Sequence, residues 1–334
     1  MPGLFSAILI GAGRRGLGAH LPALLGNRLV ELVSIVDTPE RIAELRATAR
    51  LAVPMFESLD EALGAQCPDF AIVATPHDSH APLALTLLSH GVPTFLEKPP
   101  ARNGSEFALL VQASQSYRTP LAVLRPFLHE PRRRQFIRML RSTALTDAVI
   151  TVQADVPSWT GHGDWRRSRE RAGGGVLIDL GYHFLDTLVT CIGRPDVGLA
   201  QLRSLDRPGA VEDEAVVQLR FDDRRIAAEL SLRCRAGLPR RGELTIADKD
   251  RRILYSSSSQ HAGARAASES AMQAIYALRR QVTLLLLNGF LDGRDGWLAK
   301  LLAQTEVMAL LAEIYAEAAR PADYQVKESA LEYS

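Results

Sequence analysis

Short apolar runs alternate with amphipathic stretches along the first third of this chain. The apolar runs predict strands at Ala7–Ile10, Leu32–Val36, Phe70–Ala74, Thr94–Leu96 and Leu121–Leu124. Helical periodicity lies between them, most clearly in Ala81–Ser89 and Ser105–Ser116. Buried strands that alternate with helices are typical of a doubly wound parallel sheet. The pattern therefore predicts an α/β domain over residues 1–124.

The pattern changes after about residue 124, in a second predicted domain that covers residues 125–334. A helix is predicted near Pro131–Leu140 and a strand near Ala148–Ala154, followed by a loop, three glycines and a helix through Leu188. Further strands are predicted in series at Val216–Phe221, Ile226–Leu232, Glu243–Ala247 and Arg252–Tyr255. Strands in series after one helix indicate an α+β domain with an open-faced, mostly antiparallel sheet.

Three further features of this second domain predict a connection, a long helix and a surface for assembly. The serine-rich stretch 256–270 is small and polar, which predicts a loose connection or lid. The long amphipathic stretch Gly296–Ala319 predicts a helix that contacts the core or another subunit. Apolar residues in Val216–Phe221 and Ile226–Leu232 can serve both faces of the sheet, so we expect an apolar face that needs cover. A homodimer or homotetramer built through that sheet would provide it.

A glycine-rich turn follows the first predicted strand, with the sequence Gly11-Ala12-Gly13-Arg14-Arg15-Gly16. Gly11 allows a sharp turn, Gly13 lets the backbone approach a pyrophosphate, and Gly16 lets the next helix pack closely. The amides of the turn and the helix dipole then face the phosphates. Glycine loops also occur as plain turns, but the strand before this one and the helix pattern after it favour a dinucleotide site.

Asp37 ends the second predicted strand, about 20 residues after the last glycine of the turn, as dinucleotide sites require. A carboxylate there can accept hydrogen bonds from ribose hydroxyls and would repel a 2′-phosphate, which favours NAD over NADP. Asp37 could also be the N-cap of a helix beginning at Thr38-Pro39-Glu40, a role compatible with ribose binding. Arg14, Arg15 and Arg41 keep NADP as an alternative.

A lysine stands at a strand end in the segment Glu97-Lys98-Pro99-Pro100, where open α/β sheets bind their ligands. Only four of the 39 basic residues are lysines, which suggests that Lys98 is needed as a compact ammonium.

The second domain contains Asp179 and His183 shortly after the triplet Gly173-Gly174-Gly175. If a helix begins near Val176, these two side chains lie one turn apart on the same face. A nearby carboxylate can orient an imidazole, and histidine titrates near neutral pH, which suits proton transfer. The alternative is a buried, hydrogen-bonded histidine and an aspartate N-cap. The glycine triplet and the Glu-Lys-Pro segment favour a catalytic role for Asp179 and His183 over a structural one.

These motifs together resemble the glucose–fructose oxidoreductase, inositol dehydrogenase and rhizopine catabolism (Gfo/Idh/MocA) family over nearly the whole chain. The resembling segments are the glycine turn, Asp37, Thr75-Pro76-His77-Asp78-Ser79-His80, Glu97-Lys98-Pro99 and the Gly-Gly-Gly…Asp-x-Gly-x-His…Asp run. The resemblance implies an N-terminal Rossmann domain and a C-terminal domain with a large open-faced sheet. It also implies reversible, NAD(P)-dependent oxidation of a secondary alcohol on a sugar, sugar derivative or cyclitol.

Carried over from this family, Lys98 would hydrogen-bond the reacting oxygen, His183 would carry the proton and Asp179 would support the site. His77 stands where the family often has asparagine, so it would contact ribose or substrate, or face solvent; the following His80 is more typical of a structural residue. The expected cofactor contacts are Gly11, Ala12, Gly13, Arg14, Arg15, Gly16, Asp37, Thr75, Pro76, His77, His80, Glu97 and Lys98. The expected substrate contacts are Lys98, Arg125, Trp165, Arg166, Asp179 and His183.

The segment 164–171 precedes the glycine triplet and carries four arginines. In the resembled family this segment approaches the substrate, so the arginines could clamp a phosphate, carboxylate or nucleotide diphosphate. The alternative is a solvated loop with partial pairing to Asp164 and Glu170. Two other functions stay open: redox-neutral or hydrolytic sugar chemistry with retained NAD, and a non-catalytic dinucleotide-binding regulator. The presence of Lys98, Asp179 and His183 argues against the regulator.

Composition narrows the class of protein further. A net charge of +1 predicts no generic nucleic-acid or membrane partner. The apolar run Leu284–Leu287 is far shorter than the roughly 18 residues of a membrane span. Residues 1–10 predict a strand and contain no basic signal-peptide region. Three widely spaced cysteines suggest a reducing cytosol without disulfides or zinc, so we expect a cytoplasmic protein with no metal.

Overall fold

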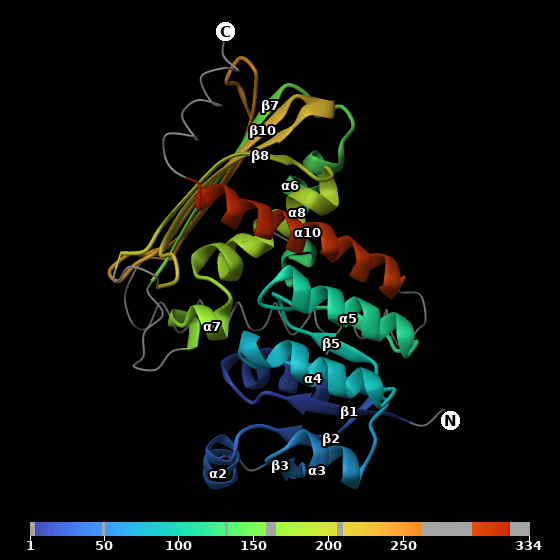
Figure 1. Ribbon diagram of the computed structural model, residues 1–334. Coiled ribbons are helices and arrows are strands. Elements are labelled where there is room, and N and C mark those ends of the chain that lie inside the picture. The colour runs from blue at the N-terminus through green and yellow to red at the C-terminus, as the bar shows by residue number, and fades with distance from the viewer. Residues whose placement is uncertain are drawn as a thin grey trace. The chain divides into compact units, whose positions relative to one another are not determined.

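The computed structural model describes residues 4–48, 51–130, 133–157, 165–205, 210–261 and 296–320. The chain divides into two compact units, the first ending at Pro126 and the second beginning at Phe127. Helix α10 (Trp297–Ala318) contributes to the first unit up to Leu302 and to the second unit from Ala303. Each unit is built around its own six-stranded sheet (Figure 1).

The sheet of the first unit is parallel throughout, as its sequence pattern predicts. Its strands are β1 (Phe5–Ile10), β2 (Val30–Val36), β3 (Met55–Phe56), β4 (Phe70–Val73), β5 (Thr94–Leu96) and β6 (Leu121–Val123). They lie in the order β3-β2-β1-β4-β5-β6, which reverses direction between β1 and β4. Ligands of doubly wound sheets bind at the carboxyl ends of the strands next to such a reversal.

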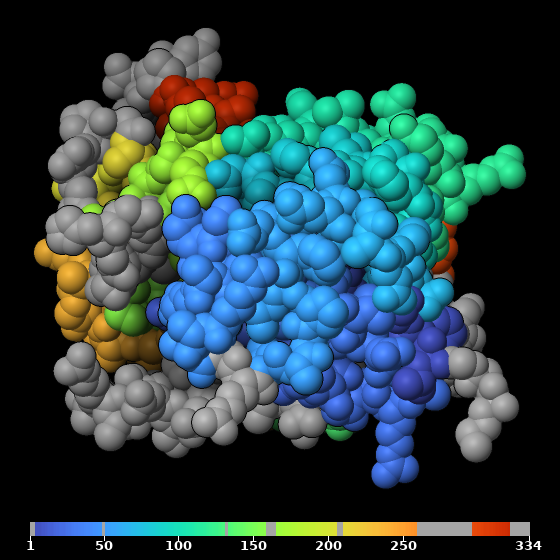
Figure 2. Space-filling view, turned by 90° about the horizontal axis from the view of Figure 1, so that it is seen from below, coloured from blue at the N-terminus to red at the C-terminus, as the bar shows by residue number. Residues whose placement is uncertain are grey.

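Helices connect these strands and bury their apolar sides on the sheet. They are η1 (Gly16–His20), α1 (Leu21–Leu25), α2 (Pro39–Thr48), α3 (Leu59–Ala65), α4 (His77–Ser89) and α5 (Gly104–Ser116). Polar residues fix two of their starts: Ser58 Oγ accepts from the Glu61 amide at 3.3 Å, and Asn103 Oδ1 accepts from the Glu106 amide at 2.9 Å. Figure 2 shows the surface of this unit over α2 and α3 in blue.

The second unit has a mostly antiparallel sheet in the order β12-β11-β7-β10-β9-β8, as predicted. Its strands are β7 (Ala148–Val156), β8 (Asp196–Arg203), β9 (Glu214–Phe221), β10 (Ile226–Cys234), β11 (Arg240–Asp248) and β12 (Ile253–His261). Only β7 and β10 pair in parallel. Helices α6 (Arg134–Arg141) and α8 (Tyr182–Cys191) lie on one side of this sheet (Figure 1).

Two local predictions for this sheet were wrong. Strand β8 was not predicted, because its alternation is weak. The serines expected in a loose connection belong to the edge strand β12, where Ser256 pairs with Thr245 and Ser258 with Glu243. Backbone hydrogen bonds hold an edge strand without apolar side chains, so a polar sequence does not exclude one. The rest of the predicted connection, residues 262–270, lies outside the described residues.

The outer face of this sheet is also more polar than its sequence suggested. Leu219 and Phe221 of β9 are buried on the helix side, together with Leu230 and Leu232 of β10. A row of alternating charge crosses the other face, from Glu214 through Arg233 and Asp155 to Arg241. The expectation of an apolar outer face was therefore wrong, and assembly through this sheet stays a prediction. No helix among the described residues is long and apolar enough to cross a membrane.

Candidate functional site

The glycine turn between β1 and η1 has the close contacts that make glycine necessary. Gly11 has a φ of +98°, and a Cβ there would lie 2.6 Å from the Ala74 carbonyl oxygen. A Cβ at Gly16 would lie 1.9 Å from the Gly11 carbonyl oxygen, so η1 packs directly on the turn. At Gly13, by contrast, a Cβ would meet nothing within 4 Å. This open space beside the amides of a helix start fits the approach of a pyrophosphate.

Asp37, at the carboxyl end of β2, is tied to this turn. Its Oδ2 accepts a hydrogen bond from the Ala12 amide at 2.6 Å, and its Oδ1 accepts one from the Thr38 amide at 2.7 Å. Thr38 is the N-cap of α2, since its Oγ1 accepts from the Arg41 amide at 3.4 Å. The interpretation of Asp37 as the N-cap was therefore wrong. Its carboxylate instead lies beside the glycine turn, and its contact with a ribose stays a prediction.

Arg41 reaches the same turn from α2. Its Nε donates to the Ala12 carbonyl oxygen at 3.0 Å, and its Nη1 lies 2.5 Å from Glu44 Oε2. One positive side chain at the turn is thus already held by two acceptors. Arg41 is therefore occupied at the turn, and the role of Asp37 in the choice between NAD and NADP stays a prediction.

Glu97 and Lys98 follow β5 and are both buried. Glu97 Oε1 lies 2.9 Å from Nε2 of the buried His20, the last residue of η1, and 3.5 Å from Nη1 of Arg15, which precedes η1. Its Oε2 accepts from the Lys98 amide at 3.3 Å, and the Lys98–Pro99 peptide bond is cis. Glu97 therefore joins the lysine segment to the glycine turn. His20 was missed from the sequence, where a single histidine among leucines gave no signal.

His77 and His80 lie in the first turn of α4, which begins four residues before the predicted helix. Both are buried, so the interpretation of His77 as facing solvent was wrong. His80 Nδ1 lies 2.8 Å from the Pro99 carbonyl oxygen and its Nε2 lies 3.0 Å from the Thr75 carbonyl oxygen. Burial lowers the pKa of His80, and the two carbonyl contacts oppose this shift. These contacts agree with a structural role, joining the end of β4 to the lysine segment.

Arg125 is the predicted substrate contact that lies in the first unit after β6. Arg125 follows β6 and is half-buried; burial, and then the charge of Arg125, lower the pKa of Lys300 in α10. No group of three His, Cys, Asp or Glu side chains in the described parts of the chain could hold a metal ion.

Asp179 and His183 lie on a helix that starts after the glycine triplet, as predicted. Its first turn is the wider π-helix η5 (Leu177–Gly181), which continues into α8, so the expected regular α-helical spacing is locally stretched. The helix follows the N-cap residue Val176, so the interpretation of Asp179 as an N-cap was wrong. Asp179 is half-buried and His183 is buried.

The His183 ring packs against one aromatic ring within the second unit. The Phe127 ring lies parallel to it, with centroids 5.0 Å apart and an interplanar angle of 14°. The Arg133 guanidinium carbon lies 3.1 Å from the Phe127 centroid, and Arg133 Nε donates to Glu130 Oε2 at 2.9 Å. The stack restricts the imidazole to one plane, which suits a group that must exchange a proton in a fixed direction.

The arginine-rich segment is described from Trp165 onward. Arg166 Nε lies 3.9 Å from Asp179 Oδ2, and its guanidinium carbon lies 4.3 Å from the Trp165 ring centroid. Arg167, Arg169 and Arg171 are exposed. The structure therefore brings Trp165 and Arg166 next to Asp179 and places the other three arginines at the surface. Asp164 lies outside the described residues.

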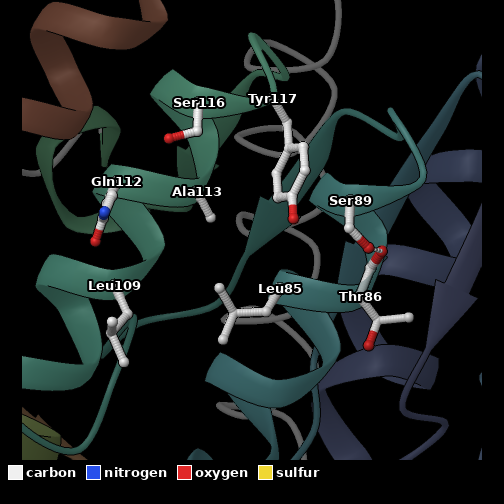
Figure 3. Close-up of a pocket in the computed structure, with 8 residues that line it drawn as sticks. All are labelled: Leu85, Thr86, Ser89, Leu109, Gln112, Ala113, Ser116 and Tyr117. Atoms are coloured by element: carbon white, nitrogen blue, oxygen red, sulfur yellow. Dashed lines mark hydrogen bonds between the residues drawn. The ribbon is translucent and has the colours of Figure 1, made fainter.

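A groove of about 490 Å³ lies between α4 and α5 (Figure 3). Leu85 of α4 and Leu109 and Tyr117 of α5 line it, with polar residues between them. Apart from Leu109, near the middle of α5, these positions lie in the C-terminal halves or just after the ends of helices that run back from the strands. The groove is therefore at the opposite end of the unit from the glycine turn, and none of the predicted site residues lines it.

Comparison with known families agrees with this arrangement. The family described as "Oxidoreductase family, NAD-binding Rossmann fold" matches residues 5–124, and the "GFO/IDH/MocA C-terminal domain" matches residues 135–247. The chain belongs to the Gfo/Idh/MocA oxidoreductase family. This confirms the resemblance, the fold class and the NAD-binding nature of the first unit of this Gfo/Idh/MocA protein.

Curated relatives of this Gfo/Idh/MocA protein include sugar-related enzymes. The chain is 34% identical over 200 residues to a "Putative UDP-kanosamine synthase oxidoreductase subunit" of Amycolatopsis mediterranei (strain S699), covering 56% of this chain and 51% of that protein. It is 26% identical over 208 residues to "D-glucoside 3-dehydrogenase" of Escherichia coli (strain K12), covering 60% and 58%. The chain thus spans about half the length of these curated relatives.

Solved structures show the same fold over nearly the whole chain. GenD2 from gentamicin A biosynthesis, in complex with NAD, has a TM-score of 0.75 at 23% identity, covering 96% of this chain and 95% of that chain. The WlbA dehydrogenase from Bordetella pertussis, in complex with NADH and UDP-GlcNAcA, has a TM-score of 0.75 at 20% identity, covering 95% and 96%. At these identities the likeness concerns the fold.

Proposed function

We propose that this protein moves a hydride between NAD and a secondary alcohol or ketone of a sugar or sugar derivative. The observation that carries the proposal is the connection of Lys98 to the glycine turn through Glu97, His20 and Arg15. A buried ammonium group so close to a dinucleotide turn fits a role on the oxygen of a substrate that reacts with the nicotinamide.

Proton transfer and charge stabilisation at the reacting oxygen are assigned to different side chains. His183 accepts the hydroxyl proton when the alcohol is oxidised and returns it when the ketone is reduced, while Asp179 on the same helix supports the site. Lys98 stabilises the negative charge that develops on the reacting oxygen. Bound NAD supplies the hydride acceptor, and the Gly13 and Asp37 surroundings would hold its pyrophosphate and ribose.

The function is tested by incubating the protein with NAD and a panel of neutral sugars, cyclitols, sugar phosphates and nucleotide sugars, and following the absorbance of reduced nicotinamide. We expect one substrate class to give reduced cofactor and oxidised product in equal amounts. Product formed without net reduction would instead favour redox-neutral chemistry with retained NAD. Tight NAD binding without turnover of any substrate would favour a regulator.

We infer that NAD is preferred over NADP. Replacing Asp37 by alanine removes the carboxylate that accepts from Ala12 and faces the ribose site, so the affinity for NAD should fall and that for NADP should rise. Fluorescence titration of both cofactors measures the change, with Glu40→Ala, at an exposed position of α2, as the control. Tighter binding of NADP than NAD by the unmodified protein would contradict the inference.

We further infer that the sugar is anionic or nucleotide-linked, because Arg166 and Trp165 lie beside Asp179. Similarity to a putative UDP-kanosamine synthase oxidoreductase subunit and to the WlbA dehydrogenase in complex with UDP-GlcNAcA supports this class. Arg166→Gln should raise KM for a nucleotide sugar by about ten- to a hundredfold, since a charge-assisted contact contributes about 1.5–3 kcal/mol. A neutral sugar should keep its KM, and Arg167→Gln, at an exposed position, should change neither. No loss for either class of sugar would mean that Arg166 is ordinary surface, and equal losses for charged and neutral sugars would contradict recognition of an anionic group.

A further inference from the structure

Glu212 is a buried residue two positions before β9, and three consecutive amides donate to it. Its Oε1 accepts from the Gly175 amide at 2.8 Å and from the Leu177 amide at 3.2 Å. Its backbone carbonyl oxygen accepts from the Val176 amide at 2.9 Å. These amides lie at the start of the helix that carries Asp179 and His183. Glu212 therefore accepts the hydrogen bonds of backbone amides that have no partner within the helix.

This helix needs a distant partner because it has no local cap. The N-cap position is Val176, whose side chain cannot accept a hydrogen bond, and no side-chain cap is formed there. Glu212, 37 positions after Gly175, supplies the acceptor instead. A carboxyl oxygen is a strong acceptor at a helix N-terminus, where the amides and the helix dipole both favour negative charge.

The glycine triplet provides the space for this contact. A Cβ at Gly175 would lie 2.0 Å from the Glu212 carbonyl oxygen, and a Cβ at Gly174 would lie 2.0 Å from the Tyr315 hydroxyl. Gly173 has a φ of +82°, which ends the preceding short helix. The glycines that marked this segment in the sequence are therefore explained by the close approach of Glu212 and Tyr315.

Tyr315 of α10 completes the arrangement. Its hydroxyl donates to Glu212 Oε1 at 2.8 Å, and its ring centroid lies 5.4 Å from the Arg169 guanidinium carbon. The second carboxyl oxygen of Glu212 is buried and has no hydrogen-bond partner among the described residues. Burial raises the pKa of Glu212 and raises that of Tyr315 well above its usual range. Three donors thus converge on one oxygen in a site shielded from water.

We propose that Glu212 is a positioning residue for Asp179 and His183. By holding the amides of Gly175 to Leu177 it sets where the helix begins, and this determines the height and rotation of the two functional side chains. The proposal rests on the proposed hydride transfer for its consequence in turnover. A misplacement of about 1 Å can lower the rate of a reaction about a hundredfold, so a modest shift of this helix is sufficient.

The kinetic test compares substitutions of Glu212 well below their melting temperatures. Glu212→Ala should lower kcat about ten- to a hundredfold and leave the Kd for NAD unchanged, because the glycine turn belongs to the first unit. Glu212→Gln retains the length and one acceptor oxygen, so it should recover most of the lost kcat. Glu212→Asp is too short by one methylene and should recover less.

Val217→Ala is the matched control for a loss of stability alone. Val217 is fully buried in β9, and the amides of the helix start donate to Glu212 and not to Val217. This variant should therefore lower the melting temperature with kcat unchanged. If Glu212→Ala and Val217→Ala lower kcat equally at equal loss of stability, the positioning role is overturned.

A second measurement does not depend on the activity. Hydrogen–deuterium exchange of peptides covering residues 175–183 should lose protection in Glu212→Ala and less so in Tyr315→Phe, which removes only one donor to Oε1. Unchanged protection in Glu212→Ala would overturn the proposal whether or not a substrate has been found. If Glu212→Ala does not fold, the Gln, Asp and Phe variants still test the predicted order. Failure of the hydride-transfer assay for the unmodified protein would count against the proposed function alone.

Discussion

His183→Ala is expected to lower kcat by about 10²–10⁴-fold, the range over which general acid–base catalysis contributes. His183 is buried and its ring stacks on that of Phe127, which holds the imidazole in a fixed orientation for proton transfer. The Kd for NAD should stay within about twofold, because the dinucleotide turn lies in the other unit. Steady-state kinetics on the identified substrate and a fluorescence titration with NAD measure both effects.

His90→Ala is the control for this experiment, since His90 is an exposed histidine at the end of α4. Lys98→Ala should resemble His183→Ala in lowering kcat, because it removes the fixed positive charge at the reacting oxygen. A His183→Ala enzyme with near-normal turnover would show that the proton leaves by another route and that the assigned role is wrong.

Two substitutions in the glycine turn should separate cofactor binding from folding. Gly13→Ala places a Cβ in open space, so stability should be unchanged, but the methyl group blocks the pyrophosphate and should weaken NAD binding about ten- to a hundredfold. Gly16→Ala places a Cβ 1.9 Å from the Gly11 carbonyl oxygen and should also destabilise the first unit by about 1–3 kcal/mol. Thermal unfolding and calorimetric titration with NAD measure the two quantities.

Gly64→Ala is the matched control, because Gly64 of α3 has open space around its Cβ position and lies outside the turn. It should change neither stability nor NAD binding beyond a small helix-propensity gain. Full NAD affinity in Gly13→Ala would mean that the pyrophosphate does not pass over this glycine.

The sequence of the first unit predicted its structure well because the signals are local. Buried parallel strands such as Phe70–Val73 are continuous apolar runs, and the glycine turn is defined by its own spacing. Asp37 could be placed at a strand end by counting from Gly16. The contact of Asp37 with Ala12 follows from that placement, whereas the role of Thr38 as the helix cap depends on where α2 begins.

Several site residues could not be predicted because their partners are distant in the sequence. Glu212 is an acidic residue in a polar stretch, and only folding brings it to Gly175 and Leu177. His20 is likewise joined to Glu97 over 77 positions. Residue type alone would place Glu212 and Glu97 at the surface, because acidic residues are seldom buried unless they are paired.

The second sheet was harder to predict for a different reason. Its strands at the edges are held by backbone hydrogen bonds, so the serines of β12 carry no apolar signature. The apolar content of the outer face was overestimated. Alternation in β9 and β10 shows that the two faces of the sheet differ, but it does not show which side chains lie on the outer face. The ion pairs between neighbouring strands appear only when the register is known.

The charged row on that outer face has a consequence for how the strands find their alignment. A slip of one residue between β7 and β10 would turn Leu230 and its buried neighbours toward water, but a slip of two residues would keep them buried. Burial therefore cannot distinguish alignments two residues apart. The paired hydrogen bonds from Arg233 to Asp155, at 2.7 and 2.9 Å, form in only one of these alignments. Such a pair contributes only about 0.2–1 kcal/mol to stability, yet it favours the native alignment where the apolar side chains do not discriminate.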